Sequence, residues 1–376
     1  MSGLFGSSSA ATTANSLGDL TKDIALNSPP EDSIADLSFS PVSNHLAVAS
    51  WDNKVRIYEI NAQGGEGKAA FDHQGPVLSC HWSSDGKKVV AAGADKAARL
   101  LDLGSGQTSA ATQVAAHDQP IRSVRFFTPA NSNAEMVVTG SWDKTIKYWD
   151  LRQSTAVATV QCQERVYTMD VAKNLLVVGT ADRYINVINL GDPSKIYKTI
   201  QSPLKWQTRV ISCFPDASGF AVGSIEGRCA IQYVEEKDAR QASSKTNSSS
   251  PMLTINPSSN FSFKCHRDPP QNNMTNVYSV NAISFHPVHG TFSTAGSDGT
   301  FHFWDGVAKH RLKGYPTVGG TISATAFNQD GSIFAYAVSY DWSKGYASNN
   351  PQYPNKIMMH PVTPEECKPR PSTKKR

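Results

Sequence analysis

Three residue types that could carry out hydrolytic chemistry stand close together in one stretch of the chain: His117, Ser141 and Asp143, with Trp149 just beyond them. In a nucleophilic hydrolase, a histidine takes the proton of a serine and an acid orients the histidine. The sequence lacks the motifs that normally accompany such chemistry. It has no Gly-x-Ser-x-Gly turn, no His-Glu-x-x-His, and no phosphate-binding loop around the Gly-Lys pair at 67–68. We therefore predict no enzymatic activity, no cofactor and no metal.

The acids belong to a pattern that recurs along the chain. Seven times a run of small and apolar residues ends in an acidic turn and resumes as a strand: Ser50-Trp51-Asp52, Ala94-Asp95, Ser141-Trp142-Asp143, Ala181-Asp182, Ile225-Glu226, Ser297-Asp298 and Tyr340-Asp341. Most intervals are close to the roughly 40 to 45 residues of one WD-type blade. Short strands with polar turns and no helical periodicity surround each turn. The pattern predicts an all-β, seven-bladed WD-repeat β-propeller.

The one long interval, between Glu226 and Asp298, does not contain an eighth blade. It holds a single strand-like run, Phe261 to Cys265, which suffices for the outer strand of the fifth blade. The serine-rich segment at about 235–260 is expected to be a polar loop insertion. In such a fold His117, Ser141, Asp143 and Trp149 fit a hydrogen-bonded set that ties one blade together, since buried polar groups need partners. We interpret these four residues as a structural tetrad rather than a catalytic site.

Closure of the ring is predicted from the two ends of the repeat array. The last blade supplies only three strands, and Asp23 to Leu26, which precede the first blade, are the natural fourth. Such a join removes the exposed sheet edge that an array would otherwise leave. The expected organisation is a disordered tail at 1–19, a propeller at 20–362 and a basic C-terminal tail at 363–376.

Composition limits the possible partners. The net charge of +4 over 376 residues is too mild to indicate a nucleic-acid-binding protein by itself. No apolar run approaches the roughly 18 residues of a membrane span, so no membrane insertion is expected. The six cysteines occur singly and without a Cys-x-x-Cys pair, which favours reduced thiols and an intracellular protein.

The acidic turns all join second to third strands, so they should project from one face of the disc. Aromatic residues precede three of the acids, at Trp51, Trp142 and Tyr340. Arginines follow or flank the same turns at Arg165, Arg183, Arg209 and Arg228. An aromatic and basic rim suits an acidic peptide or a phosphate chain such as single-stranded RNA. The alternative is that some tryptophans pack between blades and the cations are paired.

Several segments together resemble one family of propellers. These are Gly140 to Asp150, Asn260 to Arg267, Phe285 to Gly290, Gly296 to Gly299 and Ser339 to Gly345. Over essentially the whole propeller they resemble the nuclear-pore-associated mRNA export propellers of the Rae/Gle type. The sister family, the Bub-type spindle-checkpoint propellers, shares two of these runs. The Tyr-Asp-Trp-Ser-Lys-Gly run at 340–345 and the Phe-Gly pair at 5–6 are more similar to the export family.

The resemblance implies a non-enzymatic adaptor in the nucleus and at the nuclear pore complex, with cytoplasmic shuttling. It would bind a GLEBS-type segment of a Phe-Gly nucleoporin. The family contacts carried over by motif are Arg228, Phe261 and Trp304, and Lys264 lies in the same Phe-Lys-Cys-His-Arg run. A basic residue usually follows the Phe-Trp-Asp motif directly, but here Gly306 does, so Lys309 or Arg311 would have to substitute.

Two other functions stay open at this point. The first is a checkpoint adaptor at the kinetochore, with a checkpoint kinase as partner. The second is a substrate receptor bound to a cullin-ligase adaptor, because Trp149 to Arg152 matches the Trp-Asp-x-Arg pattern of such receptors. A blade of this type supplies half of that pattern by default.

Overall fold

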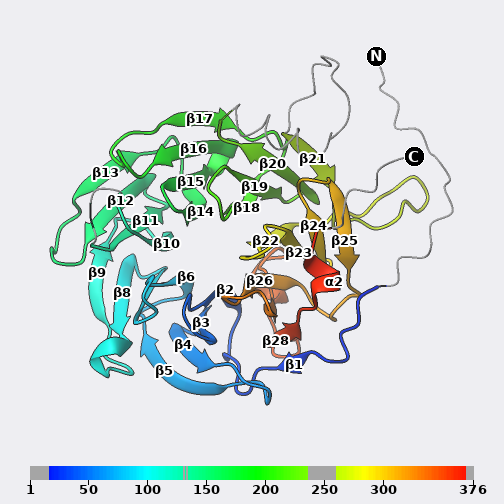
Figure 1. Ribbon diagram of the computed structural model, residues 1–376, viewed down its shortest axis with the longest axis horizontal. Helices are drawn as coiled ribbons and strands as arrows, with labels where there is room; N and C mark the ends of the chain where they lie inside the picture. Colours follow the sequence, from blue (N-terminus) through cyan, green and yellow to red (C-terminus); the bar gives the residue numbers. More distant parts are fainter. Residues whose placement is uncertain (1–16, 130–131, 133, 236–259, 370–376) are drawn as a thin grey trace.

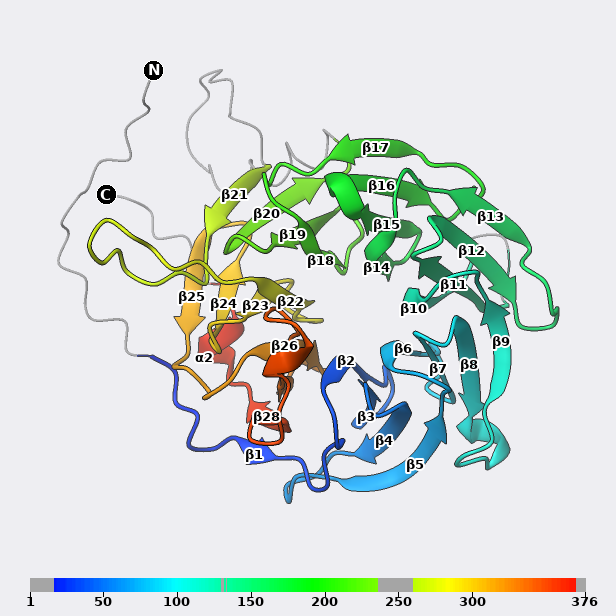
Figure 2. The ribbon, with the colours of Figure 1, turned by 180° about the vertical axis from the view of Figure 1, so that it is seen from behind.

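Seven four-stranded antiparallel sheets stand around a central channel as the blades of a propeller (Figure 1). This computed structural model describes residues 17–129, 132, 134–235 and 260–369. The predicted all-β, seven-bladed architecture is therefore confirmed. In each blade the first strand lines the channel and the fourth lies at the circumference (Figures 1 and 2).

The strands of the first four blades follow one another in chain order. Blade one contains β2 (Ile34–Phe39), β3 (His45–Ser50), β4 (Lys54–Glu59) and β5 (Glu66–Asp72), and blade two contains β6 (Val77–Trp82), β7 (Lys88–Gly93), β8 (Ala97–Asp102) and β9 (Thr112–Ala116). Blade three contains β10 (Ile121–Phe127), β11 (Met136–Ser141), β12 (Thr145–Asp150) and β13 (Ala158–Gln161), and blade four contains β14 (Val166–Ala172), β15 (Leu175–Thr180), β16 (Tyr184–Asn189) and β17 (Lys198–Gln201).

The remaining three blades follow the same order until the last sheet. Blade five contains β18 (Thr208–Cys213), β19 (Gly219–Ser224), β20 (Arg228–Tyr233) and β21 (Phe261–Lys264), and blade six contains β22 (Val280–Phe285), β23 (Phe292–Gly296), β24 (Phe301–Asp305) and β25 (His310–Gly314). Blade seven contains β26 (Ile322–Phe327), β27 (Ile333–Val338), β28 (Lys356–Pro361) and β1 (Ile24–Ala25). Short helices are η1 (Leu103–Ser105), η2 (Ala181–Arg183), η3 (Tyr346–Ser348) and α2 (Pro364–Cys367).

The second strands form the densest part of each blade. Strand β15, for example, reads Leu-Leu-Val-Val-Gly-Thr and is buried at every position. A strand with both faces covered is expected to be apolar throughout rather than alternating. Fourth strands such as β9 are mostly exposed and carry polar residues. The core clusters connect neighbouring blades, so each sheet is stabilised by the sheets on either side.

The seven acidic turns share one backbone conformation. The residue after the acid has a positive φ in every blade, for example 70° at Lys144, 62° at Gly227 and 60° at Trp342. In five blades the acid also accepts a hydrogen bond from the backbone N–H two residues later, as between Asp143 and Thr145 at 2.9 Å. Asp and Asn favour such turns because their short side chains bond to the nearby backbone. We call the side of the disc that carries these turns the acid-turn face.

In the structure the N-terminal strand is the outermost strand of the last sheet. β1 pairs with β28 through Ile24 and Met359 and through Ala25 and Met358. Figure 1 shows β1, in blue, beside the red strand β28. The backbone N–H of Leu26 then donates to the carbonyl of Ile357 at 2.8 Å. The last sheet is therefore completed by a strand from the N-terminal end of the chain.

Much of the predicted tails and of the polar insertion lies outside the described residues, which omit 1–16, 130–131, 133, 236–259 and 370–376. Described residues on both sides of the predicted propeller boundaries, 20 and 362, also pack on the propeller. The N–H of Gly18 donates to the carbonyl of Gly314 at 2.8 Å. On the other side, α2 places Cys367, only 2% exposed, in the apolar cluster of blade six. An apolar residue in a charged stretch gave no sequence pattern long enough to reveal this helix.

Candidate partner-binding surfaces

The histidine of blade three lies at the centre of a hydrogen-bonded network. Nδ1 of His117 lies 2.7 Å from the carboxylate of Asp143, and Nε2 lies 2.7 Å from Oγ1 of Thr139. The indole N–H of Trp149 donates to the same Thr139 hydroxyl at 2.8 Å. Burial lowers the pKa of His117 despite the nearby Asp143, so the ring is neutral at pH 7.

Ser141 does not join this network in the way a nucleophile would. Its hydroxyl donates to the carbonyl of Pro120 at 2.9 Å and accepts the N–H of Asp143 at 3.1 Å. The hydroxyl that links His117 to Trp149 belongs to Thr139, a residue that the sequence analysis missed. Thr139 precedes Ser141 by two positions, and residues two apart share one face of a strand, so this periodicity was the available signal.

Blade six repeats the network with other residues. His266 lies 2.9 Å from Asp298 and 2.9 Å from Thr294, and the indole N–H of Trp304 donates to Thr294 at 2.9 Å. Trp304 therefore occupies the structural position that Trp149 occupies in blade three. Its ring is half-exposed nonetheless, and it packs on Phe263 with the ring centroids 4.5 Å apart.

Aromatic side chains gather on the acid-turn face, but not all are those expected. Trp51 stacks on Trp342 with a centroid distance of 4.1 Å, and Trp142 is 37% exposed. Tyr340, expected at the rim, is only 4% exposed, because its hydroxyl accepts the N–H of Lys344 and donates to the carbonyl of Gly345. The rim prediction is wrong for Tyr340. The positive φ of Trp342 at the turn places that ring at the surface instead.

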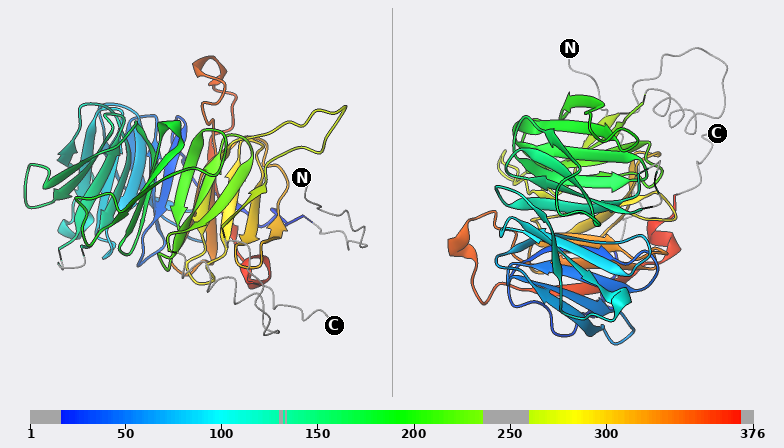
Figure 3. Two further views of the ribbon diagram at one scale, coloured as in Figure 1. Left: turned by 90° about the horizontal axis from the view of Figure 1, so that it is seen from above. Right: turned by 90° about the vertical axis from the view of Figure 1, so that its left-hand side faces the viewer.

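Two further aromatic residues on connecting segments of this face escaped the sequence analysis. Trp206, in the segment between β17 and β18, is 60% exposed, and Tyr346 in η3 is 85% exposed. The segment carrying η3 stands out from one face of the disc (Figure 3). Neither residue adjoins an acidic turn, so the repeat pattern could not indicate them. Exposed aromatic residues in a group are typical of a docking surface.

The predicted arginines lie around the same face in different surroundings. Arg165 is exposed, whereas Arg183 donates to the carbonyl of Leu204 at 2.9 Å. Arg209 points to the channel and donates to the carbonyl of Asp341 at 3.3 Å. The guanidinium of Arg228 lies 3.9 Å from Glu226, and about a third of the side chain is exposed. The rim is therefore basic, and several of its cations already have partners within the propeller.

The remaining predicted residues form a second surface on the side of the disc. Strand β21 of blade five lies beside β24 and β25 of blade six in Figures 1 and 2. We define the five–six patch as Phe261, Phe263, Trp304, Lys309 and Arg311. Nζ of Lys309 lies 4.9 Å from the centroid of the Phe261 ring, and Arg311 is opposite Trp304 in the strand register. Lys309 therefore places a cation beside this patch, although Gly306 directly follows Asp305.

Arg228, Phe261 and Trp304 were expected to form one contact set, but in the structure they lie at two separate places. Arg228 is paired with Lys264 at one end of the β20–β21 ladder, and Phe261 is paired with Ile231 at the other. Three residues of strand correspond to roughly 10 Å. Arg228 and Lys264 therefore adjoin the acid-turn face, whereas Phe261 and Trp304 belong to the five–six patch. A single extended peptide of a few residues is long enough to contact both.

The repeat is matched by a known family model. The model described as WD domain, G-beta repeat, matches residues 25–59, 68–102, 109–150 and 261–305. Each match begins on the outer strand of one blade and covers the first three strands of the next. The matched unit is therefore shifted by one strand relative to the structural blade.

Full-length relatives are more specific. The chain is 65% identical to the mRNA export factor GLE2 of Chaetomium thermophilum over 100% of both chains. The chain belongs to the family of WD40-repeat mRNA export factors. It is also 56% identical to the Poly(A)+ RNA export protein of Schizosaccharomyces pombe over 98% of both chains, and 44% identical to the mRNA export factor of Danio rerio over 98% of this chain and 95% of that one.

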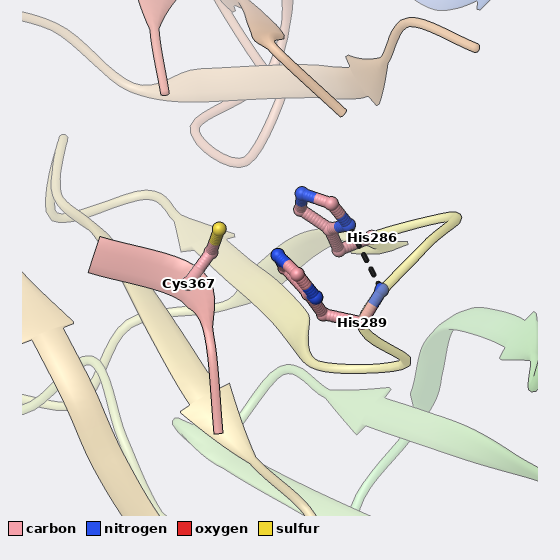
Figure 4. A group of neighbouring side chains, drawn as sticks. All are labelled: His286, His289 and Cys367. Carbon is pink, nitrogen blue, oxygen red and sulfur yellow. Dashed lines mark hydrogen bonds between the residues drawn. The ribbon is translucent and has the colours of Figure 1, made fainter. Parts of the chain in front are cut away.

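One cluster in this member of the export-factor family has the composition of a metal site. His286, His289 and Cys367 place their ligand atoms within 4.8 Å of one another, between blade six and α2 (Figure 4). However, Nδ1 of His286 accepts hydrogen bonds from the N–H groups of Val288 and His289, both at 3.2 Å. Burial lowers the pKa of His286 to about 4, so the neutral ring carries its proton on Nε2. Neither nitrogen then offers a free lone pair, and these residues fit the packing of α2 rather than a metal ion.

The helices in the described part of the chain are short. None of them is long and apolar enough to cross a membrane.

Proposed function

We propose that this chain is a non-enzymatic adaptor that supports nuclear export of mRNA by binding a GLEBS-type segment of a Phe-Gly nucleoporin. It would act in the nucleus and at the nuclear pore complex, with shuttling to the cytoplasm. The names of its relatives support the export role. The acid-turn face supports the binding of a peptide.

The observation that carries the proposal is the combination of exposed aromatic rings and cations on one face. Trp142, Trp206 and Tyr346 offer apolar area that water does not solvate well, and Arg165 and Arg228 lie on the same face. Interface hot spots are enriched in Trp, Tyr and Arg. An acidic peptide with apolar anchors complements such a surface in both respects.

Arg228 is the residue that we assign to the carboxylates of the peptide. Its contact with Glu226, at 3.9 Å, is longer than a charge-assisted hydrogen bond, so the guanidinium retains donors for a partner. Exposed Lys264 lies opposite it in the strand register and adds to the positive charge. Phe261 and Trp304 would hold an apolar residue of the same segment at the five–six patch.

Calorimetry with a GLEBS peptide tests this assignment. Arg228→Glu should weaken binding about a hundredfold, because a repulsion replaces an attraction at a desolvated interface. Lys195→Glu is the matched control, since it makes the same charge change on an exposed residue of the opposite face and should leave affinity unchanged. A normal melting curve for both variants is expected. If the unmutated protein does not bind the peptide, the adaptor proposal fails.

Affinity capture from cell extract, followed by mass spectrometry, separates this function from the two alternatives. Recovery of a nucleoporin supports the proposal. Recovery of a checkpoint kinase or of a cullin-ligase adaptor as the main partner would contradict it. For the ligase alternative, Arg152 is the residue to change, because its guanidinium is held at the surface by two hydrogen bonds to Asp150.

A further inference from the structure

Every first strand has a β-bulge at its second residue. The registers of β2, β6, β10, β14, β18, β22 and β26 all shift at that position. The bulged residues are Ala35, Leu78, Arg122, Tyr167, Arg209, Asn281 and Ser323. A bulge re-aims a side chain that the regular pleat would place elsewhere. The seven positions form a ring at the end of the channel nearest the acid-turn face.

Only two residues of this bulge ring are charged, and both are arginines. All members except Tyr167 line a cavity of about 520 Å³ in the channel, which Trp51, Trp142 and Trp342 also border. Asp36, Asp170 and Asp341 line the same cavity. Arg122 and Arg209 belong to blades three and five. The cavity has the size of a small-molecule site rather than of a single side chain.

Within the described residues, the side-chain hydrogen bonds of both arginines go only to backbone carbonyls. Arg122 donates to Leu78 at 3.1 Å, and Arg209 donates to Asp341 at 3.3 Å. The carboxylate of Asp341 is already bonded to Ser297 and Asn281. A guanidinium has five N–H donors, so most donors of the pair face the cavity.

A third arginine in the channel shows the contrast. Arg125 lies deeper, 3.2 Å from Asp170 and 3.8 Å from Asp36, so two acids compensate its charge. Within the described residues, neither Arg122 nor Arg209 has such an ion pair with a carboxylate. Burial and the neighbouring charge of Arg209 lower the pKa of Arg122 to about 10, which is the expected effect of two cations placed close together in a desolvated site. Both remain charged at pH 7.

We propose that Arg122 and Arg209 form a binding site for a small molecule that carries two neighbouring phosphate groups. Each planar guanidinium matches a phosphate bidentately. Two guanidiniums on non-adjacent blades suit a diphosphate better than a single carboxylate, and a cavity of this size is too small for a nucleic-acid duplex. This site adjoins the peptide surface proposed above, since Trp142 borders both, but its two arginines are not assigned to the peptide.

Calorimetry with pyrophosphate as the probe, at low salt, tests the proposal. Pyrophosphate should bind with a submillimolar dissociation constant, and orthophosphate should bind more weakly. Arg122→Gln and Arg209→Gln should each weaken pyrophosphate binding about tenfold, because each removes a charge-assisted pair. The affinity of Arg209→Lys for pyrophosphate should fall between those of Arg209→Gln and the unmutated protein. Lysine retains the positive charge but not the two parallel N–H donors of the guanidinium.

Arg165→Gln is the matched control, because Arg165 is an exposed arginine just before β14 that does not line the cavity. It should leave pyrophosphate binding unchanged, and melting curves verify that each variant folds. The proposal is overturned if pyrophosphate does not bind, or if Arg165→Gln weakens binding as much as the cavity variants. It is also overturned if Arg122→Gln and Arg209→Gln weaken binding of a GLEBS peptide alone, since the arginines would then serve the peptide.

Discussion

The carboxylate of Asp23 lies 2.6 Å from Nδ1 of His360, and this contact joins the N-terminal segment to the last strand of the propeller. Tyr336 donates its hydroxyl to the other oxygen of Asp23 at 2.6 Å, and Glu366 of α2 lies 3.6 Å from Nε2 of His360. The ring is therefore fastened by a buried charged cluster as well as by the backbone ladder of β1. Breaking a buried pair by removing one partner is costly.

The charge of His360 predicts how stability depends on pH. Burial acts to lower its pKa, but hydrogen bonds to Asp23 and Glu366 more than offset burial and raise it to about 9. The stabilisation is therefore complete below the unfolded pKa of about 6.5 and is lost as pH rises through about 9. Asp23→Asn should lower the free energy of unfolding by on the order of 2 kcal/mol at pH 6. This gap should narrow by pH 9.5 in urea titrations, whereas a gap independent of pH would show that His360 is not charged in the fold.

Truncation tests the closing strand directly. Deleting residues 1–26 removes β1 and Asp23, and it should lower the melting temperature sharply because the edge of β28 and a buried cluster lose their partners. Deleting residues 1–16 retains β1 and should leave the melting temperature nearly unchanged. Calorimetric scans of the two truncations measure the difference. Equal melting temperatures would contradict a stabilising role for β1.

The hydroxyl of Thr139 should contribute more to the free energy of unfolding than the hydroxyl of Ser141. Thr139→Val keeps the shape of the side chain but leaves buried His117 and Trp149 without their shared partner, at a cost of about 2–4 kcal/mol. Thr294→Val makes the equivalent change in blade six and should cost a similar amount. Urea midpoints measure both. If each substitution costs less than about 0.5 kcal/mol, the hydroxyl does not link the network.

Phe261 and Trp304 should respond differently to substitution, although they lie in one patch. Trp304→Ala loses a hydrogen bond to Thr294 and its packing on Phe263, and should cost about 3 kcal/mol. Phe261→Ala affects a half-exposed ring on an outer strand and should cost about 1 kcal/mol or less. Denaturant titrations compare the two. If Phe261→Ala lowers the free energy of unfolding as much as Trp304→Ala does, Phe261 is a packing residue rather than a candidate for partner binding.

Single-stranded RNA should bind with modest affinity that falls steeply with salt. The rim cations are few and several already have partners in their own blades, so the electrostatic attraction is weak. Aromatic rings can stack on bases at the same time. Fluorescence anisotropy with a single-stranded oligomer at 50 and 200 mM salt, about a fourfold increase, checks this. Tight binding that salt does not change would contradict the prediction.

The repeat could be predicted from the sequence because each blade has the same local sequence pattern. An acidic turn and an apolar second strand recur seven times, and such patterns are local in sequence. The position of Tyr340 was not readable, because its burial depends on a hydrogen bond to the segment that follows it. Arg209 was expected only as a rim residue, and its proximity to Arg122 was not predicted. Their convergence requires bulges in two sheets that are distant in sequence.

The family resemblance predicted the fold and the export family, but it did not predict how the candidate residues are arranged on the blades. It grouped Arg228 with Trp304. In the structure, Arg228 lies at the start of the third strand of blade five, and Trp304 lies near the end of the third strand of blade six. Motif residues carry no information about which end of a strand they occupy until the register of the sheet is known. Trp304 shows the same limitation, since a blade tryptophan and a contact residue look alike in sequence.

The pairing of β1 with β28 sets an order on the synthesis of this protein. Ile24 leaves the ribosome among the first residues of the propeller, and its partner Met359 is made more than three hundred residues later. At roughly 5–20 residues per second, that interval is tens of seconds. Blades one to six can form their sheets while the chain is still growing, but blade seven cannot. The ring is therefore completed only after its last strand has been made, and until then the first strand has no partner.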